Sequence, residues 1–388
     1  MTPGARVAAA IEVLDDWLAG APAEKLLTTW ARTHRFAGSG DRAAIRDHVF
    51  EAIRCRRSFA ALGGAETGRG LMIGALRAAG RDPDVVFTGA GYAPAPLAAG
   101  EGAGAVLAEL PEAVRLDCPD WLAPELRASL GADFAPVMAV LRHRAPVFLR
   151  VNKALGGVAE ARAALAAEGI ETRPQALAET ALEVTEGARK VQGARAYRDG
   201  LVELQDAASQ AVVDALGVGP GERVLDYCAG GGGKTLALAA AGAEVAAHDA
   251  DPGRMRDLPA RAARAGVTAR ILTPEAVAGA APFDLVFADA PCSGSGAWRR
   301  APEGKWRLTR DRLDALLEVQ ARILDETARL VAPGGRLAYA TCSLLDAENG
   351  AQIRAFLDRH KGWRCDLERR FTPLDGGDGF YVATMSHS

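Results

Sequence analysis

Two cysteines and an aspartate follow segments of this sequence that have the composition of buried strands. The mostly apolar run 283–288 ends in Asp289, and Cys292 lies shortly after it. A second apolar run, 336–340, leads directly to Cys342. In open α/β sheets, ligands and reacting groups gather outside the carboxyl ends of the strands. We therefore expect Asp289, Cys292 and Cys342 to share one crevice in which a thiolate attacks a substrate.

Attack by a cysteine at neutral pH requires help, because the pKa of a free thiol is about 8.5. A neighbouring positive charge stabilises the thiolate and lowers that pKa. Arg299, Arg300 and Lys305 follow Cys292 closely and are the predicted source of this charge. The residues alone do not decide whether Cys292 or Cys342 is the nucleophile.

The six cysteines are spread along the chain, and none has CxxC spacing. This argues against a zinc site and against the disulfide framework of a small secreted protein, so no metal is expected. We interpret Cys55, Cys118 and Cys365 as small buried hydrophobes. Cys228 lies in a glycine-rich turn, where we expect it to line a cofactor rather than to react.

That turn, residues 226–235, reads Asp-Tyr-Cys-Ala-Gly-Gly-Gly-Gly-Lys-Thr, and its glycines allow a ligand to approach the backbone closely. The phosphate-binding loop pattern fails because Cys228 stands where the first glycine belongs, and the dinucleotide fingerprint lacks its last glycine. Asp226 would repel a phosphate but suits an ammonium or sulfonium group. Asp249, after the next strand, is placed to bind ribose hydroxyls. The sequence thus favours S-adenosylmethionine over a nucleotide phosphate.

From residue 205 onward, predicted strands and helices alternate regularly. The strands are expected at 223–227, 244–248, 269–272, 283–288 and 336–340, and the helices at 206–216, 234–241, 253–265, 311–330 and 348–360. A turn is expected at 333–335, and two further strands near 363–367 and 380–384 close the pattern. This rhythm predicts a doubly wound, mostly parallel sheet in a domain of residues 205–388.

The first part of the chain has a different organisation. Residues 1–135 carry apolar side chains at helical spacing and no convincing strand alternation, which predicts a helical domain. A small α/β segment, 136–204, follows with strands at 146–152, 170–173 and 181–184 and a helix at 158–168. Basic residues recur in both parts: Arg54, Arg56, Arg57, Arg142, Arg144, Arg150, Lys153, Arg189, Lys190, Arg195 and Arg198. They could contact RNA phosphates or be ordinary solvated surface charge.

The bulk composition limits the possible partners. The net charge of −3 gives no global positive field, so local clusters must carry any contact with nucleic acid. No uncharged apolar run is long enough to span a membrane, and the N-terminus lacks a signal-peptide core. These features predict a soluble, cytoplasmic protein without a membrane partner. The oligomeric state is not encoded in any visible pattern, and a monomer is the starting expectation.

Two thiols, an acid and a methyl-sulfonium cofactor fit one reaction. Atom C5 of cytosine is too weak a nucleophile to attack a methyl sulfonium unaided. A thiolate that adds to C6 makes C5 enamine-like, and Asp289 near N3 or the exocyclic amine would stabilise the adduct. After methyl transfer the C5 proton leaves and the thiol is eliminated, with help from the second cysteine. The base must be turned out of any stack to reach the pocket.

From about residue 150 to its end, the sequence resembles the Sun, or RsmB-like, family of RNA cytosine-5 methyltransferases. The matching motifs are Leu149-Arg-Val-Asn152, 202–210, 224–235, Asp289-Ala-Pro-Cys-Ser-Gly-Ser-Gly296, Lys305-Trp306, Pro333-Gly-Gly335, Tyr339-Ala-Thr-Cys-Ser343, Glu348-Asn349 and 376–381. Through Asp41-Arg42 and the helix after it, the N-terminus resembles a NusB-type RNA-binding domain. The resemblance implies a Rossmann-like catalytic core, the small α/β segment as an RNA-binding element, and ribosomal RNA, most consistent with the 16S type, as substrate.

The resemblance also implies roles for individual residues. The cysteine of the Thr-Cys-Ser motif, Cys342, becomes the nucleophile, and that of the Pro-Cys motif, Cys292, assists product release; DNA cytosine-5 methyltransferases instead use the Pro-Cys cysteine as nucleophile. Asp289 joins them as a catalytic residue. The implied cofactor contacts are Cys228, Ala229, Gly230, Gly231, Gly232, Gly233, Lys234, Asp249 and Asp289.

The sequence departs from the family pattern at two places. Gly230-Gly231 replaces the usual Ala-Pro, which removes the stiffness of proline from the turn. The usual acid after the third strand is missing, and Glu275 is the proposed substitute for it as a cofactor contact. Neither departure touches the thiols, so we expect an active enzyme.

Other functions remain open on the residues. They are a catalytically silent RNA-binding or ribosome-assembly factor, a cytosine-5 methyltransferase acting on tRNA, and a methyltransferase acting on DNA or protein. Intact Cys292, Cys342 and Asp289 argue against the first, and basic residues after Cys292 favour a folded RNA: Arg299, Arg300, Lys305, Arg307, Arg310 and Arg312. Trp298 and Trp306 could stack on a base or simply pack.

Overall fold

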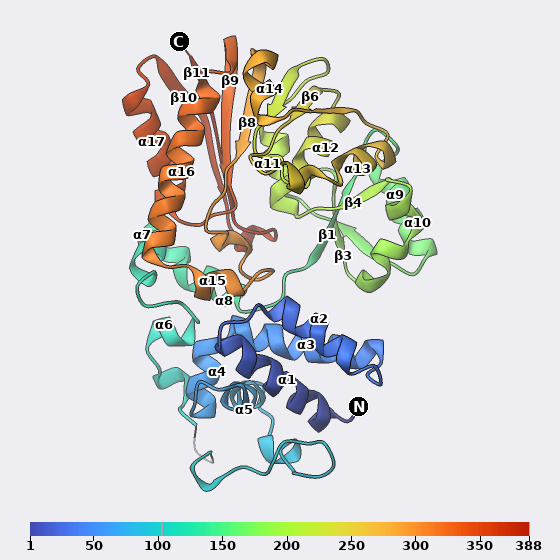
Figure 1. Cartoon of the computed structure of the whole chain (residues 1–388), viewed down its shortest axis with the longest axis vertical. Helices are drawn as coiled ribbons and strands as arrows, with labels where there is room; N and C mark the ends of the chain where they lie inside the picture. Colours follow the sequence, from blue (N-terminus) through green and yellow to red (C-terminus); the bar gives the residue numbers. More distant parts are fainter. Residues whose placement is uncertain (102–103, 388) are drawn as a thin grey trace. The chain divides into compact units, whose positions relative to one another are not determined.

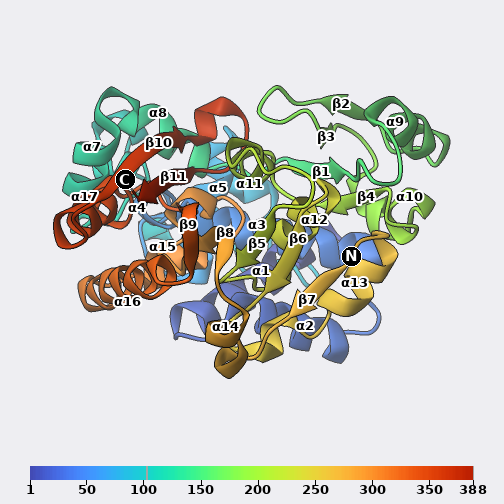
Figure 2. The same cartoon turned by 90° about the horizontal axis from the view of Figure 1, so that it is seen from above.

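The computed structural model describes residues 1–101 and 104–387. The chain divides into two compact units. The first consists of Met1–Arg144 with Trp298–Arg307, and the second of Ala145–Ala297 with Leu308–Ser388. Figure 1 labels most of the helices and strands of both units, and Figure 2 adds β2, β5 and β7.

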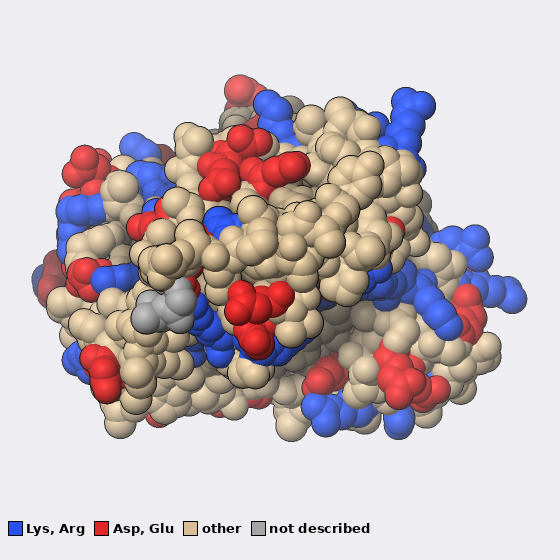
Figure 3. All heavy atoms as spheres, turned by 90° about the horizontal axis from the view of Figure 1, so that it is seen from below, with Lys and Arg blue, Asp and Glu red and all other residues tan. Residues whose placement is uncertain are grey.

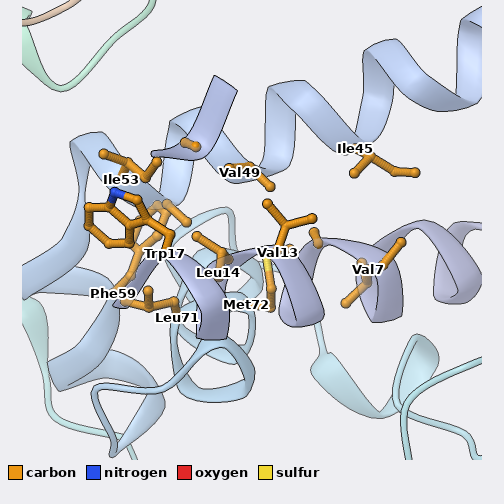
Figure 4. Packing of buried hydrophobic residues seen from close by; sticks show 14 of the residues in the cluster. Val7, Val13, Leu14, Trp17, Ile45, Val49, Ile53, Phe59, Leu71 and Met72 are labelled. Carbon is orange, nitrogen blue, oxygen red and sulfur yellow. The ribbon is translucent and has the colours of Figure 1, made fainter. Parts of the chain in front are cut away.

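The first unit is built from helices. They are α1 (Pro3–Leu18), α2 (Ala23–Thr33), α3 (Ser39–Arg54), α4 (Arg56–Gly63), α5 (Gly68–Ala78), α6 (Glu112–Arg115), α7 (Ala123–Leu130), α8 (Phe134–Leu141) and α15 (Glu303–Arg307). Its core lies between α1, α3 and α5, whose apolar residues recur at helical spacing (Figure 4): Val7, Val13, Leu14, Trp17, Ile45, Val49, Ile53, Leu71 and Met72. The predicted helical N-terminal domain is confirmed, and it fits the NusB-like expectation.

Glycines let α4 and α5 pack with their backbones almost in contact. A Cβ atom on Gly63 would lie 1.8 Å from the carbonyl oxygen of Gly70, and one on Gly74 would lie 1.9 Å from that of Phe59. No side chain fits at either position, so the sequence between residues 63 and 74 is constrained by close packing.

Helix α15 belongs to this unit although it lies far along the chain. The ring N–H of Trp17 donates to Glu303 Oε1 at 3.0 Å, and the indole N–H of Trp306 donates to the carbonyl of Ile53 at 2.7 Å. The ammonium of Lys305, which is 1% exposed, donates to the carbonyl of Arg54 at 3.0 Å. The local sequence pattern did not predict this placement.

The second unit contains a small antiparallel sheet with the strand order β2-β3-β1-β4. Its strands are β1 (Val147–Val151), β2 (Thr172–Pro174), β3 (Ala181–Val184) and β4 (Val202–Leu204), and β4 was not predicted. Apolar residues of α9 (Val158–Ala167) and α10 (Arg195–Arg198) pack into the same core as β1 and β3. The small α/β segment expected from the sequence is therefore present.

The second sheet of this unit has seven strands in the order β10-β11-β9-β8-β5-β6-β7. They are β5 (Arg223–Asp226), β6 (Glu244–Ala247), β7 (Ala269–Ile271), β8 (Phe283–Asp289), β9 (Val331–Thr341), β10 (Trp363–Phe371) and β11 (Phe380–His387). Strands β5 to β9 pair in parallel, and β11 is antiparallel to β9 and β10. The order reverses between β5 and β8, where a doubly wound sheet places its ligand site.

Helices cover both faces of this sheet (Figure 2). Alternate strand residues such as Val224 and Phe287 pack with α11 (Ala207–Ala215) and α12 (Gly233–Ala240). Their neighbours, such as Leu225 and Val286, pack with α14 (Pro274–Ala280), α16 (Arg310–Ala328) and α17 (Gly350–Arg359). Helix α13 (Leu258–Arg264) packs against α12. The predicted doubly wound α/β core is confirmed; α14 was not predicted.

The expected turn at 333–335 is instead a bulge within β9. The pairing of β8 with β9 jumps from Phe283–Val331 to Leu285–Arg336. Gly334 has φ of 76°, a left-handed conformation that glycine adopts without steric cost. The glycines thus absorb extra residues inside the strand, as β-bulges do.

Charge on the molecular surface is mixed. Figure 3 shows basic and acidic side chains interspersed over the face that it displays. None of the helices in the described part of the chain combines the length and the apolar character that a bilayer-spanning helix requires.

Candidate active site

The two cysteines predicted to share a crevice are in contact. Strands β8 and β9 are parallel neighbours with Asp289 in register with Ala340, so the chain leaves both strands at the same edge of the sheet. The sulfur atoms of Cys292 and Cys342 are 3.4 Å apart, and both side chains are partly buried. One thiol can therefore donate a hydrogen bond to the other.

A pocket of about 350 Å³ opens beside the thiols. It is lined by Gln205, Ser209, Asp226, Cys228, Ala229, Gly230, Gly231, Gly233, Lys234, Arg254, Asp289, Ala290, Pro291, Cys292 and Cys342. All these residues belong to the second unit. The structure thus places most of the predicted cofactor residues and all three predicted catalytic residues around one cavity.

Lys234 is one of two cationic residues, with Arg254, that line this pocket. Its ammonium lies 2.6 Å from Asp289 Oδ2 and 5.0 Å from the centre of the Phe380 ring. Burial alone would lower the pKa of Lys234, but Asp289, Cys342 and Asp226 together raise it above its usual value. Lys234 therefore remains a cation in the pocket that the two thiols line.

The prediction that Lys305 provides this charge was wrong. Lys305 packs inside the helical unit, where burial lowers the pKa of its ammonium to about 8. The side chain of Arg299 is also buried in that unit, and its carbonyl accepts from Arg54 Nε at 2.7 Å. Arg299, Arg300 and Lys305 are not among the residues that line the pocket of Cys292.

The Cys292 thiol is held in its protonated form by its surroundings. The hydrogen bond with Cys342 has the largest effect, and burial, the charge of Cys342 and the charge of Glu348 add to it; together they raise the pKa of Cys292 well above its usual value. A thiol of this kind can donate a proton or share one with its neighbour.

The glycine-rich turn joins β5 to α12 and requires glycine at defined positions. Gly230 and Gly232 have φ of 52° and 80°, in the left-handed region. A Cβ atom on Gly232 would also lie 2.3 Å from Leu258 Cδ1. Gly232 therefore packs against Leu258, whereas Gly230, Gly231 and Gly233 line the pocket.

Asp226 presents an unsatisfied oxygen in the buried floor of the pocket. Its Oδ2 accepts from the hydroxyl of Thr235 at 2.6 Å, but Oδ1 has no hydrogen-bond partner. Burial, with contributions from Asp289 and Asp249, raises the pKa of Asp226 to about 7. A carboxyl group in this state is stabilised by a ligand that brings a positive charge or N–H donors.

Asp249 is positioned by the same turn. Its Oδ2 accepts from the amide of Gly230 at 2.9 Å and from Arg254 Nη1 at 2.9 Å, and its Oδ1 accepts from the amide of Asp251 at 3.0 Å. The side chain of Arg254 is 58% exposed and can move away at little cost. Asp249 is not among the residues that line the pocket. To contact a ligand, its carboxylate would have to exchange its ion pair with Arg254 for a contact with that ligand.

Comparison with known proteins identifies the family. A family model described as 16S rRNA methyltransferase RsmB/F matches residues 213–386, and one described as the RsmF/B-like ferredoxin-like domain matches residues 118–192. Ribosomal RNA small subunit methyltransferase B of Xylella fastidiosa strain 9a5c is 35% identical over 286 residues, which cover 69% of this chain and 68% of that protein. The chain belongs to the RsmB/F methyltransferase family.

The protein of the same name from Vibrio cholerae is 35% identical over 289 residues, which cover 71% of this chain and 66% of that relative. The match thus spans about two-thirds of the length of these curated relatives. The crystal structure of PH0851 has a similar fold, with a TM-score of 0.75 at 24% identity, covering 100% of this chain and 99% of that chain. These comparisons confirm the family resemblance read from the motifs.

Membership in the RsmB/F family also confirms S-adenosylmethionine as the cofactor. The pocket residues fit it. The unpartnered Oδ1 of Asp226 suits its ammonium group, and the glycines at 230, 231 and 233 leave the backbone open to a ligand. A buried carboxylate oxygen without a partner is consistent with a site for a positively charged ligand.

Besides Asp249, two further predicted cofactor residues do not line the pocket. Glu275 is exposed in the first turn of α14, where a hydrogen bond with its own backbone amide and one with Thr273 lower the pKa of its carboxyl. Its contact with the cofactor remains a prediction. Gly232, as described above, faces Leu258.

Other lining residues were not singled out from the sequence. Gln205, whose Oε1 is buried without a partner, and Ser209 lie in the matched segment 202–210 but carry no chemical signature of their own. Arg254 follows Asp249 by a few residues, yet only the folded turn brings its guanidinium to the site. Among the described residues, no group of His, Cys, Asp and Glu side chains forms a metal site.

Proposed function

We propose that this chain transfers a methyl group from S-adenosylmethionine to C5 of a cytosine in RNA, with 16S-type ribosomal RNA as substrate. The observation that carries the proposal is the pair of thiols 3.4 Å apart, next to Asp289, in the pocket that also contains the glycine-rich turn. The names of the relatives, ribosomal RNA small subunit methyltransferase B, support the choice of RNA.

Cys342 is the proposed nucleophile. Its sulfur adds to C6 of the cytosine, and the electron pair of the C5–C6 bond becomes available at C5. The assignment rests on the Thr341-Cys342-Ser343 motif, and the raised pKa of Cys292, caused first by its hydrogen bond with Cys342, agrees with it. Lys234, which forms a salt bridge with Asp289, brings a positive charge to the pocket that Cys342 also lines.

Asp289 is proposed to bind the edge of the base at N3 or the exocyclic amine and so to stabilise the adduct. The salt bridge with Lys234 fixes the position of this carboxylate at the carboxyl end of β8. When bound, S-adenosylmethionine supplies an electrophilic methyl group that C5 attacks. The target base must leave its stack to enter the pocket.

Release of the product requires two bonds to break. The C5 proton passes to solvent water, its electron pair re-forms the C5–C6 double bond, and the bond from C6 to the Cys342 sulfur is cleaved, which leaves a thiolate on Cys342. Cys292 is proposed to assist by exchanging a proton within its contact distance of 3.4 Å to Cys342. A thiol pair at this separation can pass a proton directly.

The test uses purified protein, S-adenosylmethionine and RNA from small ribosomal subunits. Bisulfite sequencing of the product should show one cytosine that becomes methylated with wild-type protein and not with Cys342→Ala. Methylation of tRNA but not of ribosomal RNA would show that tRNA, and not ribosomal RNA, is the substrate. Cofactor binding without methylation of any RNA would overturn the proposal and favour the assembly-factor function.

A further inference from the structure

A buried carboxylate, Glu348, lies directly behind the two cysteines. It follows β9 and is fully buried. Its Oε1 accepts from the amide of Ser293 at 2.8 Å and from Gln320 Nε2 at 3.0 Å. Its Oε2 accepts from the hydroxyls of Ser293 and Ser343, each at 2.5 Å. These contacts use both oxygens of an acceptor-only carboxylate.

The neighbours of Glu348 complete a framework around the thiols. Asn349 Oδ1 accepts from the Thr341 hydroxyl at 2.5 Å, and its Nδ2 donates to the carbonyl of Ser343 at 2.9 Å. Gln320 also donates to the carbonyl of Pro291 at 3.0 Å. The residues before and after each cysteine are therefore tied to Glu348, Asn349 or Gln320.

Ser293 and Ser343 both bind one oxygen of Glu348, although they follow different strands. A single side chain therefore fixes the two loops with respect to each other. Hydrogen bonds from the backbone support this arrangement, since the amide of Gly296 donates to the carbonyl of Cys342 at 2.9 Å. Buried hydrogen-bond networks of this kind hold a local geometry rigidly.

We propose that Glu348 is a positioning residue, which holds Cys292 and Cys342 at reaction distance by binding the serine that follows each of them. The inference rests on the proposed two-thiol reaction and assigns Glu348 no contact with RNA or cofactor. Its role is to keep the nucleophilic sulfur of Cys342 and the sulfur of Cys292, which assists product release, at their contact distance.

Two substitutions separate geometry from charge. In Glu348→Gln, the amide oxygen can accept from Ser293 N and Gln320, and the amide nitrogen can donate to the two serine hydroxyls, so the framework is retained. In Glu348→Ala, all these contacts are lost. The charge of Glu348 also contributes to the raised pKa of Cys292, after the hydrogen bond with Cys342 and burial, and the Gln variant removes only this charge.

The first measurement is steady-state methylation over a range of pH. Glu348→Ala should lose about 100-fold in kcat with KM for RNA and cofactor affinity unchanged, because misplacement by about 1 Å has this effect. Glu348→Gln should stay within about 10-fold of wild type because the framework is retained, and the pKa of Cys292 should be lower because one neighbouring negative charge is removed. Gln320→Ala, a milder change, should show a smaller loss in kcat.

The second measurement does not need catalysis. Diamide oxidises two adjacent thiols to a disulfide, taking their two electrons and two protons, and mass spectrometry of the digested protein measures the Cys292–Cys342 product. Its rate in Glu348→Gln should equal or exceed that of wild type, because the geometry is retained and the Cys292 thiol loses its proton more readily. In Glu348→Ala, where the geometry is lost, the rate should fall at least about 10-fold. Asp117→Ala is the matched control: this fully buried carboxylate accepts from Ser58 and Arg142 in the helical unit.

The outcomes are distinguishable. Wild-type protein without methylation activity would refute the proposed function, while the cross-linking rates would still test Glu348. Wild-type kcat and cross-linking in Glu348→Ala would overturn the inference. The same rate in Asp117→Ala as in Glu348→Ala would also overturn it, because the effect would then reflect general destabilisation.

Discussion

Asp226 is 1% exposed, and its unpartnered oxygen in the cofactor pocket makes a testable prediction about stability. Burial is the main cause that raises its pKa from 3.8 to about 7 in the folded chain. The folded protein therefore binds a proton over a pH range in which the unfolded chain has released it. Asp226→Asn removes this titration and keeps an oxygen that can accept from Thr235.

The magnitude follows from the shift. A difference of about 3 pKa units at 1.36 kcal/mol per unit corresponds to ~4 kcal/mol. Because the folded pKa is raised, wild type has no penalty below about pH 3.8, loses stability as the pH rises, and reaches a constant deficit above about pH 7. The Asn variant should therefore gain stability relative to wild type between these values, and the gain should level off at higher pH.

The assay is urea unfolding of cofactor-free wild type and Asp226→Asn at several pH values from about 5 to 8. Any fixed cost of the amide shifts the difference in free energy of unfolding equally at all pH values, so the slope carries the information. A difference that stays constant with pH would refute the raised pKa. Saturating S-adenosylmethionine should reduce the wild-type deficit, because a cationic ligand favours the ionised carboxylate.

Three further predictions concern the site. Cys342→Ala should abolish methylation and leave cofactor binding, measured by calorimetry, unchanged; turnover in this variant would move the nucleophile to Cys292. Cys292→Ala should accumulate a covalent RNA adduct that survives denaturing electrophoresis, and absence of the adduct would remove Cys292 from product release. Gly232→Ala should destabilise the protein by roughly 1–3 kcal/mol in thermal unfolding, because its Cβ would overlap Leu258 and its φ is positive, whereas Gly279→Ala, with open space at its Cβ, should have little effect.

The sequence predicted those parts of the site that depend on local pattern. Apolar runs ending in small or acidic residues mark strand ends, and the rule for parallel sheets then brings Asp289, Cys292 and Cys342 together. The glycine-rich turn was also recognisable locally, because its glycines are consecutive in the sequence. Both signals lie within a few residues of the functional side chains.

The remaining features depend on contacts between distant segments. Lys305 follows Cys292 in sequence, yet its partner is the carbonyl of Arg54. Glu348 and Gln320 meet Ser293 only because α16 and the turn after β9 pack on the same face. The Pro333-Gly334-Gly335 pattern predicted a turn. These residues form a bulge instead because β9 pairs with β8 on both sides of them, and this pairing involves a distant segment. The raised pKa of Asp226 is caused mainly by burial, which the spacing of residues in the sequence does not reveal.

The position of α15 has a consequence for biosynthesis. The helical unit contains Met1–Arg144 but needs Trp298–Arg307 for hydrogen bonds to Trp17 and Ile53. About 150 residues separate these two parts, so at 5–20 residues per second the ribosome makes the later one roughly 8 to 30 s after the first. During this interval the nascent helices expose the surface that α15 later covers. A fragment that ends at residue 144 should therefore be prone to aggregation, and adding the 298–307 peptide should improve its solubility.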